Sequence, residues 1–262
     1  MTYPLSLAAG NVQEFDPPDM VSAAHHAGFD MTGLWVDLDH WTHATTREVK
    51  SRLAAADVTV LDVEVVWIQP GPSNPIHKKT IDIGAELGAQ FVLIVSSDPD
   101  RSATKSKFEE LCTHAGTNEM TAVLEFLPIT EIKSLTDALD VVEDVAHPSS
   151  GILVDTLHLI RSGSTIDAVQ AADPGLFPYC QIADAPAALA DPTFEKLMSE
   201  AIDGRLLPGD GELPLADIMN ALPTDLPVSP EIRSLALREK YPDISDRARA
   251  IYQSSRAFLD SL

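Results

Sequence analysis

The sequence is poor in cysteine and in basic side chains. It holds two cysteines, Cys112 and Cys180, among 262 residues, which excludes a disulfide framework and favours a reducing compartment. Lysine and arginine number 18 against 40 acidic residues, so the formal net charge is −22. Because so acidic a surface repels phosphate backbones and anionic membranes, we expect neither nucleic acid nor a membrane as a partner.

Long hydrophobic runs are also missing. No apolar stretch approaches the roughly 20 residues that cross a bilayer. The first twenty residues lack the basic segment and apolar stretch of a secretory signal. These features predict a cytoplasmic protein. No composition break marks a linker, so we expect one domain over residues 1–262.

What the sequence does contain is a regular alternation of short apolar runs and longer amphipathic segments. The runs are rich in Val, Leu and Ile and apolar on both faces, as buried parallel strands are. The predicted strands cover residues 4–9, 31–36, 58–63, 91–95, 121–126, 151–155, 179–183 and 227–232. Predicted helices include 17–27, 46–56, 75–87, 105–114 and 132–145, with a closing helix from 243 to 262.

Eight strand–helix repeats favour a (β/α)8 TIM barrel, which belongs to the α/β class. An open doubly wound sheet is the alternative. Against it, the first strand–helix turn lacks a Gly-x-Gly-x-x-Gly loop, and no Walker-type lysine loop occurs. The segment 185–212 is predicted to be irregular and to cover the mouth of the barrel, where loops carry function.

Polar side chains stand at the ends of the later strands. Glu125, Asp155 and Glu231 end the fifth, sixth and eighth predicted strands, and Gln181 lies within the seventh. Glu64 adds a carboxylate near the end of the third, where we expect it to bind substrate. Since chemistry in such barrels is located at the carboxyl ends of the strands, we expect these groups to share one site.

A divalent metal ion would explain this grouping. Buried carboxylates cost several kcal/mol unless they are paired. The nearby basic residues are few, with Arg161, Arg205 and Arg233 the plausible ones. An all-oxygen ligand set favours Mg²⁺ or Mn²⁺ over Zn²⁺. His158 follows Asp155 by three residues, a spacing that turns it toward the same rim as a second-shell or substrate-binding group.

Five segments carry a resemblance to a known family. LEFLPIT, VDTLHLIRSG, QIADAP, RLLPGDGELPL and SPEIRS, in this order, resemble the sugar phosphate isomerase/epimerase family with a xylose isomerase-like TIM barrel. Members hold one Mn²⁺, Mg²⁺ or similar ion with Glu, Asp, His and Glu from consecutive late strands. The resemblance implies Glu125, Asp155 and Glu231 as ligands, with Gln181 where sugar epimerases usually place histidine. In this respect the chain resembles some 3-dehydroshikimate dehydratases of the same superfamily.

The resemblance also implies an activity. It is that of a metal-dependent isomerase or epimerase acting on a small polyhydroxy carbonyl compound through an enediolate, with a dehydratase as the alternative outcome. Glu125 and Glu231 would form the acid–base pair. His158 and Arg205 match family residues that orient substrate oxygens. A homo-oligomer is a further expectation.

Other readings stay open at this stage. Apurinic endonucleases use the same barrel with several zinc ions, but the eight histidines mostly fall outside the strand ends. A non-catalytic barrel that binds a small molecule is also possible, because Gln181 is a weaker ligand than histidine. Trp35 lies near an early strand end, where it either walls a substrate pocket or simply packs.

Overall fold

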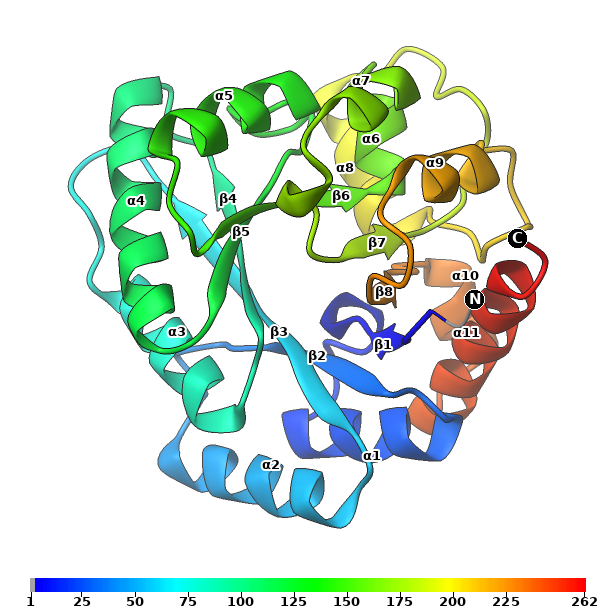
Figure 1. The fold of residues 1–262 in the computed structure, drawn as a ribbon. Coiled ribbons are helices and arrows are strands. Elements are labelled where there is room, and N and C mark those ends of the chain that lie inside the picture. The colour runs from blue at the N-terminus through cyan, green and yellow to red at the C-terminus, as the bar shows by residue number, and fades with distance from the viewer. Residues whose placement is uncertain (1–2) are drawn as a thin grey trace.

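The computed structural model describes residues 3–262, which form a closed barrel of eight parallel strands surrounded by helices (Figure 1). The strands follow chain order around the sheet, each pairing in parallel with the next. They are β1 Ser6–Leu7, β2 Met31–Trp35, β3 Thr59–Ile68, β4 Phe91–Ser96, β5 Thr121–Glu125, β6 Ser150–Asp155, β7 Cys180–Ile182 and β8 Val228–Pro230. A parallel bridge from Leu5 to Val228 closes the ring. The predicted TIM barrel is therefore confirmed.

A helix follows almost every strand and lies on the outside of the barrel (Figure 1). The longer helices are α1 Pro17–Ala27, α2 His43–Ala55, α3 Ile76–Leu87, α4 Arg101–Thr117, α5 Leu135–Val145, α8 Phe194–Asp203 and α11 Ile244–Leu259. Shorter ones are α6 Thr156–Arg161, α7 Ile166–Ala171, α9 Leu215–Ala221 and α10 Leu235–Lys240, with 3-10 turns η1 Ala9–Asn11 and η2 Pro174–Leu176. The closing helix α11 packs against α1 and so joins the two ends of the chain.

The core has an outer and an inner part, as the two-faced apolar strands require. The outer part joins strands to helices. The inner part consists of strand residues such as Leu93, Val123 and Leu153, together with Tyr179 just before β7, and fills the barrel. Side chains alternate along each strand, so Tyr179 and Gln181 face the interior while Cys180 packs outward against Met219 of α9.

One prediction about the loops is wrong. The segment 185–212 was expected to be irregular, yet it contains α8 (Phe194–Asp203). Thr193 caps this helix by accepting a hydrogen bond from the Lys196 N–H, a local signal that the proline-rich surroundings conceal. Within residues 3–262 no helix is both long and apolar enough to span a membrane.

Candidate metal-binding active site

The four residues expected to share a site lie on four consecutive strands. Glu125 and Asp155 are the last residues of β5 and β6, Gln181 is the middle residue of β7, and Glu231 directly follows β8. All four are nearly inaccessible to solvent, with relative exposures of 6% or less. The Glu231 N–H donates to the carbonyl of Ile182 at 2.9 Å, which holds the end of β8 against β7.

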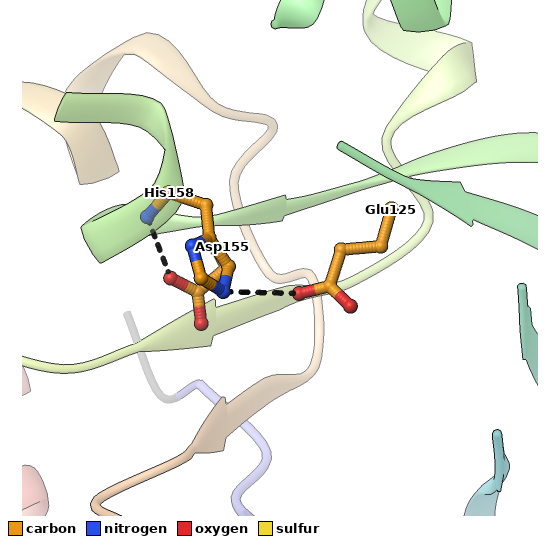
Figure 2. Close-up of side chains that lie close together, drawn as sticks. All are labelled: Glu125, Asp155 and His158. Atoms are coloured by element: carbon orange, nitrogen blue, oxygen red, sulfur yellow. Dashed lines mark hydrogen bonds and ion pairs between the residues drawn. The ribbon is translucent and has the colours of Figure 1, made fainter. Parts of the chain in front are cut away.

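Glu125, Asp155 and His158 lie close enough to bind one ion. Each offers a ligand atom within 4.8 Å of the other two (Figure 2). Helix α6 begins immediately after Asp155, whose Oδ1 accepts a hydrogen bond from the His158 N–H at 3.0 Å. This capping interaction brings the imidazole to the end of β6, where Nε2 lies 3.9 Å from Glu125 Oε1.

Arg205 bridges two of the carboxylates. Its Nη1 lies 2.6 Å from Asp155 Oδ2 and its Nη2 lies 2.9 Å from Glu231 Oε2, with the side chain 3% exposed. Its Nε also donates to the carbonyl of Ala201 at 2.8 Å. The sequence suggested Arg205 as a substrate-binding residue. The structure shows that it is also the main counter-charge of the site.

Arg205 also determines the tautomer of His158. Its Nη2 lies 3.3 Å from His158 Nε2, and a guanidinium can only donate, so Nε2 accepts and Nδ1 carries the proton. Burial lowers the pKa of His158 to about 4, with the nearby guanidinium groups adding to the effect against the attraction of Asp155. His158 is therefore neutral at physiological pH.

The site is strongly electronegative. Burial, together with the charges of Asp155 and Glu231, raises the pKa of Glu125 well above its usual value. Burial would also raise the pKa of Asp155, but Arg205 and His158 outweigh it and the pKa is lowered. Burial alone would lower the pKa of Arg205, whereas Asp155 and Glu231 raise it above its ordinary value.

Two acidic residues of β3 extend this cluster into the barrel. Glu64, expected as a substrate-binding residue, is 3% exposed, and Asp62 is fully buried. The Tyr179 hydroxyl donates to Asp62 Oδ2 at 2.8 Å. Sequence reasoning missed Asp62 and Tyr179. The signal was present, because two carboxylates spaced two residues apart in an otherwise apolar strand must face the same side.

Trp35 lies in a different part of the mouth. It lines a cavity of about 620 Å³, formed by the residues around α1 and α2 together with Trp41 and the Asp37–His40 pair. Glu125, Asp155 and Glu231 do not line this cavity. Arg161, considered as a counter-charge from sequence, instead pairs with Glu200 of α8 at 2.7 Å. The structure thus brings Glu125, Asp155 and His158 within ligand distance of one another and joins Glu231 to Asp155 through Arg205, whereas Trp35 lines a separate cavity.

Comparison with known protein families assigns this barrel to one of them. The model of the xylose isomerase-like TIM barrel family matches residues 21–262. The chain belongs to this family. Among curated proteins, no sequence matches the chain.

Solved structures agree on the fold of this family member. IolI protein with a bound zinc atom superposes with a TM-score of 0.81 at 16% identity, over 98% of each chain. D-psicose 3-epimerase from Clostridium cellulolyticum H10, solved with D-tagatose, superposes with a TM-score of 0.69 at 16% identity, over 98% of this chain and 97% of that one. The probable 3-DHS dehydratase AsbF from Bacillus anthracis superposes with a TM-score of 0.68 at 17% identity, over 97% of this chain and 98% of that one.

One of the similar solved structures belongs to a longer protein. The chain spans 42% of the length of a xylose isomerase-like TIM barrel/4-hydroxyphenylpyruvate dioxygenase fusion protein, with a TM-score of 0.80 at 20% identity over 97% of this chain. At these identities the likeness establishes the fold alone.

The residues of this family member fit a divalent cation. The amide oxygen of Gln181 is buried and has no hydrogen-bond partner, so it is free to serve as a neutral oxygen ligand. Asp155 and Glu231 share one guanidinium, while Glu125 lies 3.9 Å from the neutral His158, so the cluster could accept a further positive charge. Each carboxylate oxygen that Arg205 contacts keeps a second lone pair. Arg205 therefore occupies part of the space beside Asp155 and Glu231, but both carboxylates can still bind an ion.

Proposed function

We propose that this chain is a divalent-metal-dependent isomerase or epimerase acting on a small sugar-like hydroxycarbonyl compound. The observation that carries the proposal is the convergence of Glu125, Asp155, Gln181 and Glu231 from consecutive strand ends, beside an uncharged histidine. The likeness to D-psicose 3-epimerase supports a sugar-like substrate.

The four residues would hold the ion, and the oxygen-only ligand set favours Mn²⁺ or Mg²⁺. The chemistry that such an ion supplies is stabilisation of the negative charge that develops on adjacent carbonyl and hydroxyl oxygens when the C–H bond between them is broken. Zinc stays a candidate because IolI holds a zinc atom.

The chain itself would move the proton. Glu231 and Glu125 stand on β8 and β5, on opposite sides of the cluster, so one carboxylate can remove a proton from carbon while the other returns one. Arg205 donates to oxygens of the site, and His158 offers its protonated Nδ1. Return of the proton to the opposite face of the same carbon is epimerisation. Its delivery to the neighbouring carbon, with the hydroxyl proton passing to the former carbonyl oxygen, is isomerisation.

A dehydratase is the second candidate. Gln181 and the likeness to the probable 3-DHS dehydratase AsbF favour it. In that reaction the same carbon loses its proton, the electron pair forms a carbon–carbon double bond, and a β-hydroxyl leaves as water after accepting a proton from a carboxylic acid of the site.

The two candidates are separated by reaction in D₂O with Mn²⁺-loaded protein. An isomerase or epimerase incorporates solvent deuterium at the carbon next to the carbonyl, while a dehydratase produces a conjugated product that absorbs in the ultraviolet. Neither signal with a panel of ketoses and 3-dehydroshikimate, together with no metal after incubation with excess Mn²⁺, would identify a non-catalytic binding barrel.

Glu231→Gln tests the acid–base assignment. We expect turnover to fall by at least about 10³-fold, because the amide keeps the shape but cannot accept the proton. The variant should still fold, as circular dichroism would show, although loss of the ion pair with Arg205 should lower its unfolding temperature. Glu86→Gln, at an exposed ion pair with Lys50, is the matched control and should be fully active. A normal rate in Glu231→Gln would refute the role.

A further inference from the structure

A cavity lies over the carboxyl ends of β1 and β2, on the same rim of the barrel as the metal-binding residues. The segments that lead into α1 and α2 form its walls, together with Trp35 at the end of β2 (Figure 1). Its volume is about 620 Å³. Small-molecule sites usually occupy about 300–1,000 Å³. None of Glu125, Asp155, Gln181 and Glu231 lines it, so the cavity is a separate candidate site.

The apolar part of the lining is aromatic. Phe15, Trp35 and Trp41 all line the cavity, and each is partly buried against the main hydrophobic core. The indole N–H of Trp41 donates to the hydroxyl of Thr46 in α2 at 2.9 Å, which fixes the orientation of the ring. Aromatic rings carry partial negative charge on their faces, so they attract cations as well as apolar groups.

The polar part of the lining is acidic. Five carboxylates contribute to it, namely Glu14, Asp16, Asp19, Asp37 and Glu48. Within residues 3–262, no lysine or arginine lines the cavity. Asp16 occupies the N-cap position of α1, yet its side chain makes no capping hydrogen bond, and Asp19 lies in the first turn of the same helix. The carboxylates of Asp16 and Asp19 are therefore available to a ligand.

One wall of the cavity already holds an organic cation. The guanidinium of Arg247 lies 5.5 Å from the centroid of the Phe15 ring, and its Nη1 lies 2.5 Å from Glu14 Oε1. The Arg247 side chain is 3% exposed, so it stands behind the wall and leaves the cavity open. The fold thus stabilises a planar cation between an aromatic ring and a carboxylate at this place.

The remaining carboxylates differ in how far they are matched. Asp37 pairs with His40 at 2.8 Å, and Glu48 lies 3.6 Å from Arg52 on the exposed face of α2. Asp16 and Asp19 face the two tryptophans without a cation from the chain. The cavity therefore repeats the combination that holds Arg247, but with the place of the cation left to a ligand.

The arrangement favours an organic cation over a metal ion. Within residues 3–262, the acidic and histidine side chains that converge closely enough for a metal ion are Glu125, Asp155 and His158, and none of them lines the cavity. A metal ion would also gain nothing from the aromatic rings. An alkylated ammonium ion is weakly hydrated and has an apolar body, so it benefits from the rings and from the nearby carboxylates together.

We propose that this cavity binds an alkylated ammonium ion, whose methyl groups lie against Trp35 and Trp41 and whose charge faces Asp16 and Asp19. The inference goes beyond the proposed function, because no step of that reaction uses these residues.

Calorimetric titration of metal-chelated protein with choline tests the inference. The neutral comparison is 3,3-dimethylbutan-1-ol, which has the shape of choline with carbon in place of the charged nitrogen. We expect choline to bind at least about tenfold more tightly than the alcohol, because only the cation gains from the ring faces and the carboxylates. Raising the salt concentration to about 0.5 M should weaken choline binding and leave the alcohol unchanged, since salt screens exposed charges.

Two pairs of variants locate the binding. Trp41→Leu should weaken choline binding about tenfold. Trp67→Leu, which removes a 37% exposed indole that does not line the cavity, should leave it unchanged. Asp19→Asn should weaken choline binding about threefold and leave the alcohol unaffected. Asp167→Asn, in the first turn of α7 and outside the cavity, is the matched control and should change neither affinity.

Equal affinities for choline and the alcohol would overturn the inference. So would equal losses in Asp19→Asn and Asp167→Asn, which would mean that choline responds to the net charge of the surface. Unchanged choline binding in a folded Trp41→Leu protein would also refute it, and the Asp19→Asn comparison decides if that variant does not fold. Because the titrations use chelated protein, their outcome is independent of the proposed metal site and its chemistry.

Discussion

Replacement of Arg205 by methionine tests whether its guanidinium and the proposed metal ion compete for the same carboxylates. The guanidinium is 3% exposed at its side chain and lies 2.6 Å from Asp155 and 2.9 Å from Glu231. Methionine keeps most of the buried volume but removes the charge. In metal-free protein the variant therefore leaves two buried carboxylates without their partner.

The magnitude follows from that geometry. Breaking a buried ion pair costs about 3–5 kcal/mol, because the charge left behind is uncompensated. At about 2–4 °C per kcal/mol for a chain of this size, metal-free Arg205→Met should unfold roughly 10 °C or more below the wild type. Metal binding should respond in the opposite direction. With its competitor gone, Mn²⁺ should bind at least about tenfold more tightly and recover much of the lost stability.

Differential scanning calorimetry of chelated and Mn²⁺-loaded protein, with Mn²⁺ titration of both forms, measures these effects. Arg249→Met is the control, because Arg249 pairs with Asp246 on the exposed face of α11 at 3.3 Å, and it should change stability by at most about 0.5 kcal/mol. Weaker metal binding in Arg205→Met, or no loss of stability without metal, would show that Arg205 and the ion do not share Asp155 and Glu231.

Two further predictions concern stability. Burial, opposed by the Tyr179 hydrogen bond and reinforced by Glu231, raises the pKa of Asp62 from 3.8 to about 7. Because the folded state holds this proton more tightly than the unfolded chain, the raised pKa stabilises the fold by roughly 4 kcal/mol below about pH 4. This stabilisation is lost as the pH rises from about 4 through about 7. Urea unfolding of chelated protein should show this decline, and Asp62→Asn should flatten it; an equally steep decline in the variant would contradict the assignment. Gly211→Ala should destabilise the protein by about 1–3 kcal/mol, since its Cβ would lie 2.6 Å from the Ala185 carbonyl oxygen and 2.7 Å from its nitrogen. Gly175→Ala, whose nearest neighbour is Asp173 Oδ1 at 3.3 Å, is the thermal-unfolding control and should be nearly neutral; equal losses in both variants would refute the steric argument.

The sequence-based predictions agreed best with the structure where a local sequence pattern was enough to predict the element. Short runs that are apolar on both faces can only be buried strands, and their regular alternation with amphipathic helices left the closed barrel as the simplest arrangement. Strand ends were also readable from the sequence, so Glu125, Asp155 and Glu231 could be grouped from their positions along the chain alone. Helix α8 was missed because its cap at Thr193 stands within a proline-rich segment that resembles a loop.

The sequence by itself determined the barrel and the set of oxygen-bearing side chains at its mouth, because both depend on residue type and on spacing along the chain. Only the tertiary structure decided how the charges are matched. Arg205 lies 50 residues from Asp155 in sequence and 26 from Glu231, yet its guanidinium contacts both. The closure of β1 against β8, and the reach of Tyr179 across to Asp62, are likewise long-range contacts that no local pattern encodes. They exist because a closed ring of strands brings distant side chains into one small, water-poor interior.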